Sequence, residues 1–301
     1  MTDTSDLFPG FDSHWIDTAA GRIFARSNGS GPPLVLLHGF PQTHVCWHRI
    51  APGLARTHRV VCMDLRGYGW SSAPRGDAEH ETYSKRAMGR DVVAVMEAFG
   101  HVRFAIAGHD RGARVGYRLA LDEPGRVERL ALLDILPTAA YWEKIRAAAA
   151  QAPHWQFLAR PAPEPETEIG KDPIAFIDGL LARWSRKGTL EAFDPRALAA
   201  YRQSANEPSR IHAFCEDYRA GATLDVVHDE QDLKAARTIA CPTVIVWSDY
   251  LARGGATETP PQVWRRTFVP DIAEAKVSAG HFLAEEDPDG TLAALRTFLG
   301  S

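Results

Sequence analysis

The segment that most constrains this chain is GHDRG at residues 108–112. It lies between a short apolar run, FAIA at residues 104–107, and a helical pattern, ARVGYRLAL at residues 113–121. Glycines on both sides of the central residue permit a cramped turn from a strand into a helix, which lifts the middle side chain above the sheet. That side chain is the carboxylate of Asp110. Because a carboxylate can attack a saturated carbon and form an ester, we interpret Asp110 as a nucleophile rather than only a helix N-cap.

Outside the middle of the chain, short apolar runs alternate with longer helical patterns. The runs are nearly continuous in hydrophobicity, which indicates parallel strands covered on both faces. Such alternation is typical of an α/β fold with a doubly wound, mostly parallel sheet. The expected strands are residues 34–37, 59–65, 104–107, 130–134, 243–247 and 275–278, and the expected helices include residues 85–99 and 113–121. Residues 14–17 and 21–26 resemble a hairpin, with its turn at residues 19–21, that would form an antiparallel edge of this sheet.

The alternation stops after Pro137. The following residues, to about residue 223, show helical and loop patterns but no convincing strand, and strand patterns resume only at Thr243. The simplest arrangement is a single sheet-based core made of residues 1–136 and 224–301. A helical cap over residues 137–223 would then be inserted between two strands of that core.

Composition narrows the classes of function. Lys and Arg number 34 and Asp and Glu 38, so a formal net charge of −4 provides no basic surface for nucleic acid or a membrane. No apolar run approaches the roughly 18 residues of a membrane span, and the acidic N-terminus does not resemble a signal peptide. The cysteines are scattered, at Cys46, Cys62, Cys215 and Cys241. We interpret them as thiols of a cytoplasmic protein rather than as a metal site.

Two further residues would complete a hydrolytic set with Asp110. His281 follows the last expected strand, where an imidazole can activate the water that hydrolyses an ester. The acid that orients this imidazole has two candidates, Asp134 at the end of RLALLD and Asp249 at the end of TVIVWSD. We favour Asp134, because its strand is apolar up to the carboxylate and a lone buried carboxylate would be costly without a partner.

Groups that could bind substrate lie beside these residues. The turn HGFP at residues 38–41 can direct the backbone N–H of Phe40 towards the site, where it would form an oxyanion hole with the Arg111 N–H. Arg111 and Arg114 stand three apart at the start of a helix, so both guanidinium groups can face one way and bind a carboxylate. Taken alone, the pair could equally be two exposed arginines. Beside a nucleophile they favour an anionic substrate and a lowered pKa of Asp110.

Taken together, these segments resemble the α/β-hydrolases, and specifically the fluoroacetate dehalogenase family. The matching segments cover nearly the whole chain: LLHGFPQTHVCWHRIAP, DLRGYGWSSAP, FAIAGHDRGARVGYRLALD, LLDILPT, HWQFLARPAPEPE, CEDYRAGA and SAGHFLAEE. GHDRGAR is the most discriminating, because haloalkane dehalogenases and epoxide hydrolases usually carry a Trp after the nucleophilic Asp, where this chain has Arg111. The resemblance implies that Asp110 is the nucleophile, Asp134 the acid and His281 the base. It also implies that Arg111 and Arg114 hold the substrate carboxylate.

The resemblance extends to the expected cap. It implies that His154, Trp155 and Tyr218 bind the departing halide and that Trp184 lies near the substrate path. Their N–H and O–H groups, converging in a dry pocket, would stabilise fluoride as its charge develops. The chain departs from the family at residues 247–249, which read WSD where the family carries Trp-Gly.

The sequence therefore predicts a hydrolase of carbon–halide bonds that converts fluoroacetate and water to glycolate and fluoride. The reaction would pass through an ester of Asp110 and need no metal or organic cofactor. The expected partner is a small anionic haloacid, and the resemblance implies a homodimer. One alternative is an epoxide hydrolase or haloalkane dehalogenase, for which the cap offers Tyr141, Tyr201 and Tyr218 as acids. Another is a non-catalytic binding protein, which would not need the nucleophile, base and acid together.

Overall fold

The computed structural model describes residues 4–147, 152–251 and 257–300, and in these ranges the core is one eight-stranded sheet. The strands are β1 (Asp12–Thr18), β2 (Gly21–Asn28), β3 (Pro33–Leu37), β4 (Arg59–Met63), β5 (Phe104–His109), β6 (Val127–Leu133), β7 (Thr243–Trp247) and β8 (Ala273–Lys276). Their order across the sheet is β1-β2-β4-β3-β5-β6-β7-β8. The pairs β1–β2 and β2–β4 are antiparallel, and all others are parallel. The predicted α/β fold is confirmed, including its antiparallel edge.

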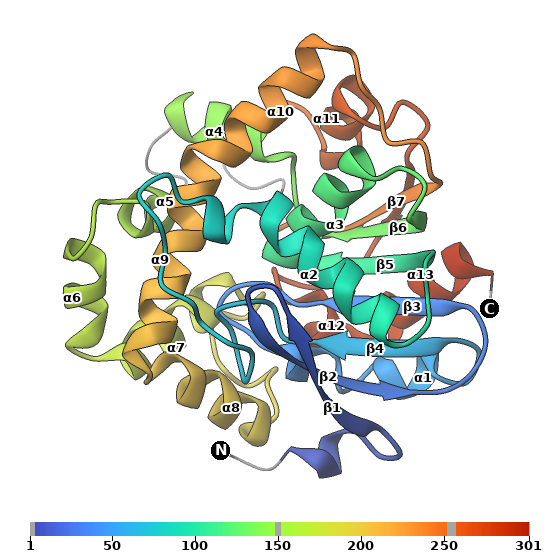
Figure 1. Cartoon of the computed structure of the whole chain (residues 1–301), viewed down its shortest axis with the longest axis horizontal. Helices are drawn as coiled ribbons and strands as arrows, with labels where there is room; N and C mark the ends of the chain where they lie inside the picture. The colour runs from blue at the N-terminus through green and yellow to red at the C-terminus, as the bar shows by residue number, and fades with distance from the viewer. Residues whose placement is uncertain (1–3, 148–151, 252–256, 301) are drawn as a thin grey trace.

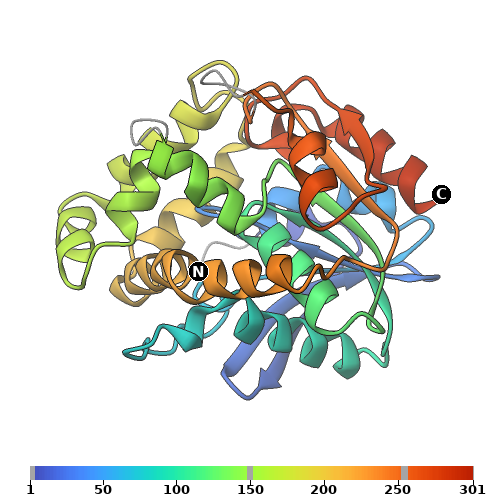
Figure 2. The same ribbon diagram turned by 90° about the horizontal axis from the view of Figure 1, so that it is seen from above.

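Helices cover both faces of the sheet (Figures 1 and 2). The longer helices α2 and α3 pack on one face, and α1, α12 and α13 lie on the other. The helices of this part of the chain are α1 (Ala51–Leu54), α2 (Lys85–Ala98), α3 (Arg111–Asp122), α11 (Pro260–Thr267), α12 (Leu283–Glu286) and α13 (Pro288–Leu299). Short 3-10 helices occur at η1 (Ser5–Leu7), η2 (His44–Trp47) and η3 (Glu81–Tyr83).

The described residues between β6 and β7 form helices and no strand. These helices are α4 (Thr138–Ala147), α5 (Pro153–Leu158), α6 (Glu164–Gly170), α7 (Pro173–Trp184), α8 (Pro195–Ala205), α9 (Pro208–Ala222) and α10 (Leu224–Lys234). Each of α5 to α9 carries a proline in its first turn, where the missing N–H costs nothing. The expected boundary at residue 223 falls at the break between α9 and α10. In the described ranges we find no helix of the length and apolar character needed to cross a membrane.

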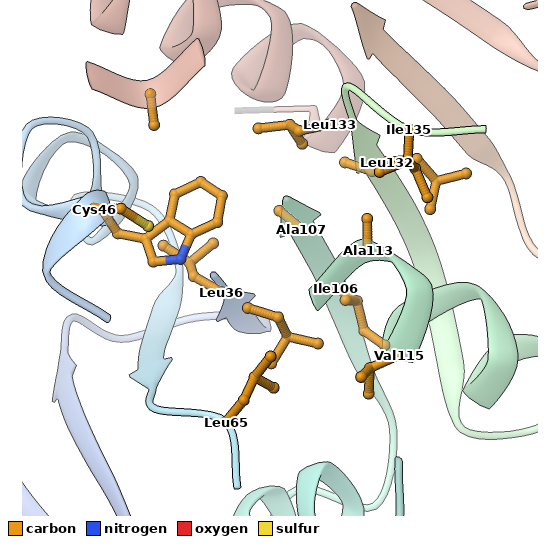
Figure 3. Close-up of a cluster of buried hydrophobic side chains, with 14 of the residues drawn as sticks. Leu36, Cys46, Leu65, Ile106, Ala107, Ala113, Val115, Leu132, Leu133 and Ile135 are labelled. Atoms are coloured by element: carbon orange, nitrogen blue, oxygen red, sulfur yellow. The ribbon is translucent and has the colours of Figure 1, made fainter. Parts of the chain in front are cut away.

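The core beneath the site is built from β3, β5, β6 and α3. Leu36, Ile106 and Leu132, one from each of these strands, are fully buried. Ala113 and Val115 of α3 lie beside Ile106 in Figure 3, and both are also fully buried. Because the first of them is small, the start of α3 can approach the sheet closely. The carboxyl end of β5 pairs with β3, with Gly108 opposite Leu37, and the turn between β5 and α3 lies at this end of the two strands.

Strand boundaries differ from the sequence prediction where a strand is exposed. The strand expected at residues 275–278 is β8, Ala273–Lys276, which lies two residues earlier. It is an edge strand with three of its four side chains exposed, so its polar sequence AEAK carries little apolar signal. Of residues 251–262, which the sequence pattern leaves unassigned, residues 252–256 lie outside the described ranges. The segment after them enters α11 at Pro260.

Candidate active site

The turn between β5 and α3 has the geometry expected of a nucleophile elbow. Asp110 has a φ of 46°, in the left-handed region of the backbone that non-glycine residues rarely adopt. A Cβ on Gly108 would lie 2.6 Å from the Cα of Ala113. A Cβ on Gly112 would lie 2.4 Å from the backbone oxygen of Leu37. Both glycines of GHDRG are therefore required by close backbone approach, and the turn they permit raises Asp110 above the sheet.

The carboxylate of Asp110 is held as an anion. The backbone N–H of Phe40 donates a hydrogen bond of 3.0 Å to its Oδ1, as an oxyanion-hole donor would. Its Oδ2 lies 3.8 Å from Nε2 of His281. Burial alone would raise the pKa of Asp110, but the positive charges of His281 and Arg111 outweigh burial and lower it. An ionised Asp110 is the form that can attack carbon.

His281 is bound to Asp134 and not to Asp249. Its Nδ1–H donates a 2.7 Å hydrogen bond to Oδ2 of Asp134, which is fully buried just after β6. Burial would lower the pKa of His281, but the bond to Asp134 and its charge raise it. The backbone N–H of Ser248 donates to the other oxygen of Asp134 at 3.2 Å. Asp249 is exposed and pairs instead with Lys276 at 2.6 Å.

The backbone of His281 is fixed by two neighbours. Its N–H donates a 2.9 Å hydrogen bond to the carbonyl oxygen of Trp184 at the end of α7, which joins His281 to the helices between β6 and β7. Its carbonyl oxygen accepts a 2.8 Å bond from Nε2 of His109. Burial lowers the pKa of His109 to about 3, so this imidazole is neutral. The sequence analysis assigned no role to His109, although it directly precedes Asp110.

Arg111 and Arg114, beside Asp110 at the start of α3, are both buried, and each has a guanidinium nitrogen without a hydrogen-bond partner among the described residues. Arg111 donates to Oδ1 of Asp217 through Nε at 3.1 Å and through Nη2 at 2.6 Å. Arg114 donates through Nη1 to the backbone oxygen of Leu136 at 3.1 Å and to Oγ1 of Thr138 at 3.0 Å. Nη1 of Arg111 and Nε of Arg114 are buried without a hydrogen-bond partner in the described part of the chain. Unsatisfied buried donors of this kind suit a bound carboxylate.

The charge of Arg111 is compensated, whereas that of Arg114 is not paired with a carboxylate among the described residues. Asp217, fully buried on α9, binds both Arg111 and Nζ of Lys85. Burial would raise the pKa of Asp217, but these two cations hold it well below its usual range. Lys85 also lies 3.3 Å from Oδ2 of Asp225. The sequence analysis missed this cluster, because Asp217 and Lys85 resemble ordinary charged residues on helix surfaces.

Asp110, Arg114 and His281 line a small cavity of about 30 Å³, whereas Arg111 and Phe40 are not among its lining residues. Its lining is Asp110, Arg114, Asp134, Tyr141, His154, Trp155, Trp184, Tyr218, Tyr250, Leu251 and His281. Helices between β6 and β7 thus contribute one wall, and the carboxyl ends of the strands contribute the other. A space of this size holds about two water-sized groups beyond the side chains, which suits a very small substrate.

The wall of the cavity opposite Asp110 is aromatic and carries polar hydrogens. The rings of His154 and Trp184 lie 4.4 Å apart, and those of Trp155 and Tyr218 lie 5.5 Å apart. Burial lowers the pKa of His154 to about 3, so it is a neutral donor. Cζ of Arg111 lies 4.2 Å from the centre of the Tyr218 ring. The residues predicted to bind halide therefore lie together, close to a cation.

Comparison with known proteins agrees with this geometry. Residues 32–288 match the family model described as alpha/beta hydrolase fold. A fluoroacetate dehalogenase from a Burkholderia species is 43% identical over 97% of this chain and 95% of its own length. A soluble epoxide hydrolase from Corynebacterium sp. (strain C12) is 29% identical over 89% of this chain and 90% of its own length.

Solved structures are also similar over nearly their whole length. The crystal structure of ALR0039 from Nostoc sp PCC 7120 is 44% identical, covers 96% of this chain and 98% of its own, and has a TM-score of 0.91. The structure of a proposed epoxide hydrolase from Pseudomonas aeruginosa is 42% identical, covers 97% of this chain and 96% of its own, and has a TM-score of 0.90.

Proposed function

The chain belongs to the α/β-hydrolases and, within them, to the family of fluoroacetate dehalogenases, and from this premise we propose that it hydrolyses haloacetates, converting fluoroacetate and water to glycolate and fluoride. One observation carries the proposal. An ionised Asp110 stands beside Arg111 and Arg114, each with a buried N–H that lacks a partner within the described ranges. A carboxylate nucleophile next to a carboxylate-binding pair suits a substrate whose reactive carbon is attached to a carboxylate.

In the first step, Asp110 attacks the carbon that bears the halogen. A bond forms between a carboxylate oxygen and this carbon as the carbon–halide bond breaks, which leaves a glycolyl ester on the enzyme. Arg111 and Arg114 hold the substrate carboxylate in place. The halide leaves towards His154 and Tyr218, with the indole N–H of Trp155 as a third donor, and these donors stabilise its developing charge.

In the second step, His281 removes a proton from water, and the resulting hydroxide attacks the carbonyl carbon of the ester. The Phe40 N–H already donates to Oδ1 of Asp110 and stabilises the oxyanion with the Arg111 N–H. Asp134 stabilises the protonated imidazole. As the intermediate collapses, the protonated imidazole of His281 returns its proton to the leaving oxygen, which releases glycolate, and the Asp110 carboxyl group, with one oxygen now supplied by water, loses its proton to solvent and becomes a carboxylate again.

The inserted helices act as a cap in this proposal. Residues 137–223 contribute His154, Trp155, Trp184 and Tyr218, and so close the site over the nucleophile. We extend the proposal to a homodimer in the cytoplasm. The four cysteines are all free thiols, which suits a reducing compartment. Light scattering of the purified protein tests the dimer.

Epoxide hydrolysis is the second candidate. Tyr141 and Tyr218 both line the cavity, so two acids could protonate an epoxide oxygen there. The hydroxyl of Tyr201 donates a 3.1 Å hydrogen bond to Glu285, and Tyr201 does not line the cavity, so it is not placed to protonate an epoxide there. The charge of Arg114 favours an anion over a neutral epoxide.

The experiment that tests the proposal compares anionic and neutral substrates. We expect fluoride release from fluoroacetate, measured with a fluoride electrode, and chloride release from chloroacetate. We expect no turnover of 1-chlorobutane or styrene oxide. The Asp110→Ala variant serves as the matched inactive control. Diol formation from styrene oxide without halide release from either haloacetate would replace the proposed function with epoxide hydrolysis, and no turnover of any compound would favour a binding protein.

A further inference from the structure

A second, larger chamber adjoins the reaction cavity. It encloses about 610 Å³. The two spaces share Tyr141, His154, Trp184, Tyr250 and Leu251. The chamber also reaches Arg183, whose side chain is exposed to solvent. The chamber therefore borders both solvent and the wall of the cavity, and His154 and Trp184 belong to the wall that the two spaces share.

Charge in the chamber has one sign. Lys144 of α4 and Arg183 of α7 line it, and no carboxylate does so among the described residues. Arg183 forms no ion pair in the part of the chain that the structure describes. Nζ of Lys144 lies 3.5 Å from the carbonyl oxygen of Leu251. His154 adds no charge, because its pKa is about 3.

The walls of the chamber carry both apolar and polar groups, and the charged side chains among them are cationic. One face of α7 supplies Ala175, Phe176, Gly179, Leu180, Arg183 and Trp184. Asp178 of the same helix is turned away and pairs with Arg202 at 2.8 Å. Charges of one sign along a concave surface raise the local concentration of counter-ions there.

We propose that the chamber is a capture site for small monocarboxylate anions. Arg183 and Lys144 attract the haloacetate carboxylate from solvent, and the anion then moves past His154 and Trp184 to Arg114. This inference rests on the proposed function. The capture site is separate from the Arg111 and Arg114 pair: it determines how fast the anion reaches the cavity, whereas the pair determines how tightly the anion is held there.

The test measures association directly. The Asp110→Ala protein is mixed with chloroacetate in a stopped-flow instrument, and binding is followed by tryptophan fluorescence, to which Trp155 and Trp184 of the cavity lining contribute. Arg183→Gln and Lys144→Gln should each lower the association rate constant about threefold at low ionic strength, with the dissociation rate constant unchanged. The difference should disappear at high salt, where the charges are screened.

Two variants serve as matched controls for total charge. Arg103→Gln and Lys187→Gln remove exposed cations that pair with Glu128 and Glu191 outside the chamber. We expect association rates within experimental error of the parent protein. An equal slowing in these controls would overturn the proposal, since net charge alone would then explain the effect. A loss that persists at high salt would also overturn it, as would a slowing of halide release without a slowing of chloroacetate association.

Failure of the proposed function gives a different result. If the enzyme with Asp110 intact releases no halide, but the Asp110→Ala protein binds chloroacetate with the predicted dependence on Arg183 and salt, capture stands and dehalogenation does not. If halide is released and the Arg183→Gln and Lys144→Gln variants associate at the parent rate, dehalogenation stands and capture does not. Circular dichroism of every variant shows whether it is folded.

Discussion

Arg114 offers the sharpest test of how the site recognises an anion. In the structure its Nη1 is committed to Leu136 and Thr138, its Nε is without a partner in the described chain, and its Cζ lies 4.6 Å from the centre of the Trp155 ring. Arg114→Lys keeps the positive charge but removes the planar group that makes both sets of contacts. The substitution therefore separates directed hydrogen bonding from charge.

The expected loss follows from these contacts. A hydrogen bond from the Nε–H of Arg114 to the substrate carboxylate is charge-assisted, and such bonds contribute about 2 kcal/mol. Because about 1.4 kcal/mol corresponds to a factor of ten, we expect kcat/KM for chloroacetate to fall about 30-fold. Most of the change should lie in KM, since the substrate carboxylate is bound in both the ground state and the transition state.

The assay compares chloroacetate with chloroacetamide, which has the same reactive carbon but no charge. The preference for the acid should fall about 30-fold in Arg114→Lys. Arg90→Lys is the matched control, because Arg90 is an exposed residue of α2 whose guanidinium pairs with Glu81. An unchanged preference for the acid in Arg114→Lys would remove Arg114 from substrate recognition and refute this reasoning.

Three further predictions concern the halide, the base and the buried ion pair. Trp155→Phe removes one N–H donor and should depress fluoride release more than chloride release, whereas equal losses would show that Trp155 only shapes the cavity. The hydrolytic step needs neutral His281, so its rate should fall as the pH falls through the His281 pKa. Asp134→Asn should move this limb of the pH–rate profile to lower pH, because Asp134 raises that pKa, and an unmoved limb would contradict this. Asp217→Asn leaves Arg111 without its counter-charge, so the free energy of unfolding should fall by about 3–5 kcal/mol at pH 7 in urea titrations. Since the pKa of Asp217 is lowered on folding, this difference should shrink below about pH 4, and a difference independent of pH would refute it.

The sheet was predictable because its signals are local. The strand at residues 243–247 was located to the residue, since all five side chains of β7 are buried and its apolar run is continuous. The predicted position of the edge strand β8 differs from the observed one by two residues, because its exposed side chains weaken the apolar pattern. The hairpin of β1 and β2 was also found, although both of its strands are longer than expected.

The site was predictable only in part. Asp110 and Asp134 directly follow β5 and β6, His281 lies five residues after β8, and parallel strands bring their carboxyl ends to one edge of the sheet. The partnership of Asp217 with Lys85 joins residues 132 positions apart, and nothing in the local pattern of either helix marks it. Tertiary packing of α9 against the core creates this contact, so it becomes visible only in the structure.

The central claim is that Asp110 forms a covalent ester, and a single turnover in heavy-oxygen water tests it most directly. Enzyme in excess is mixed with fluoroacetate, and the glycolate and the peptide that contains Asp110 are analysed by mass spectrometry. The account predicts mostly unlabelled glycolate and a labelled Asp110 peptide, because water refills the carboxylate. In His281→Ala the ester should persist on that peptide as an added mass. Labelled glycolate in the first turnover, with no ester trapped in His281→Ala, would instead show direct attack by water and contradict the account.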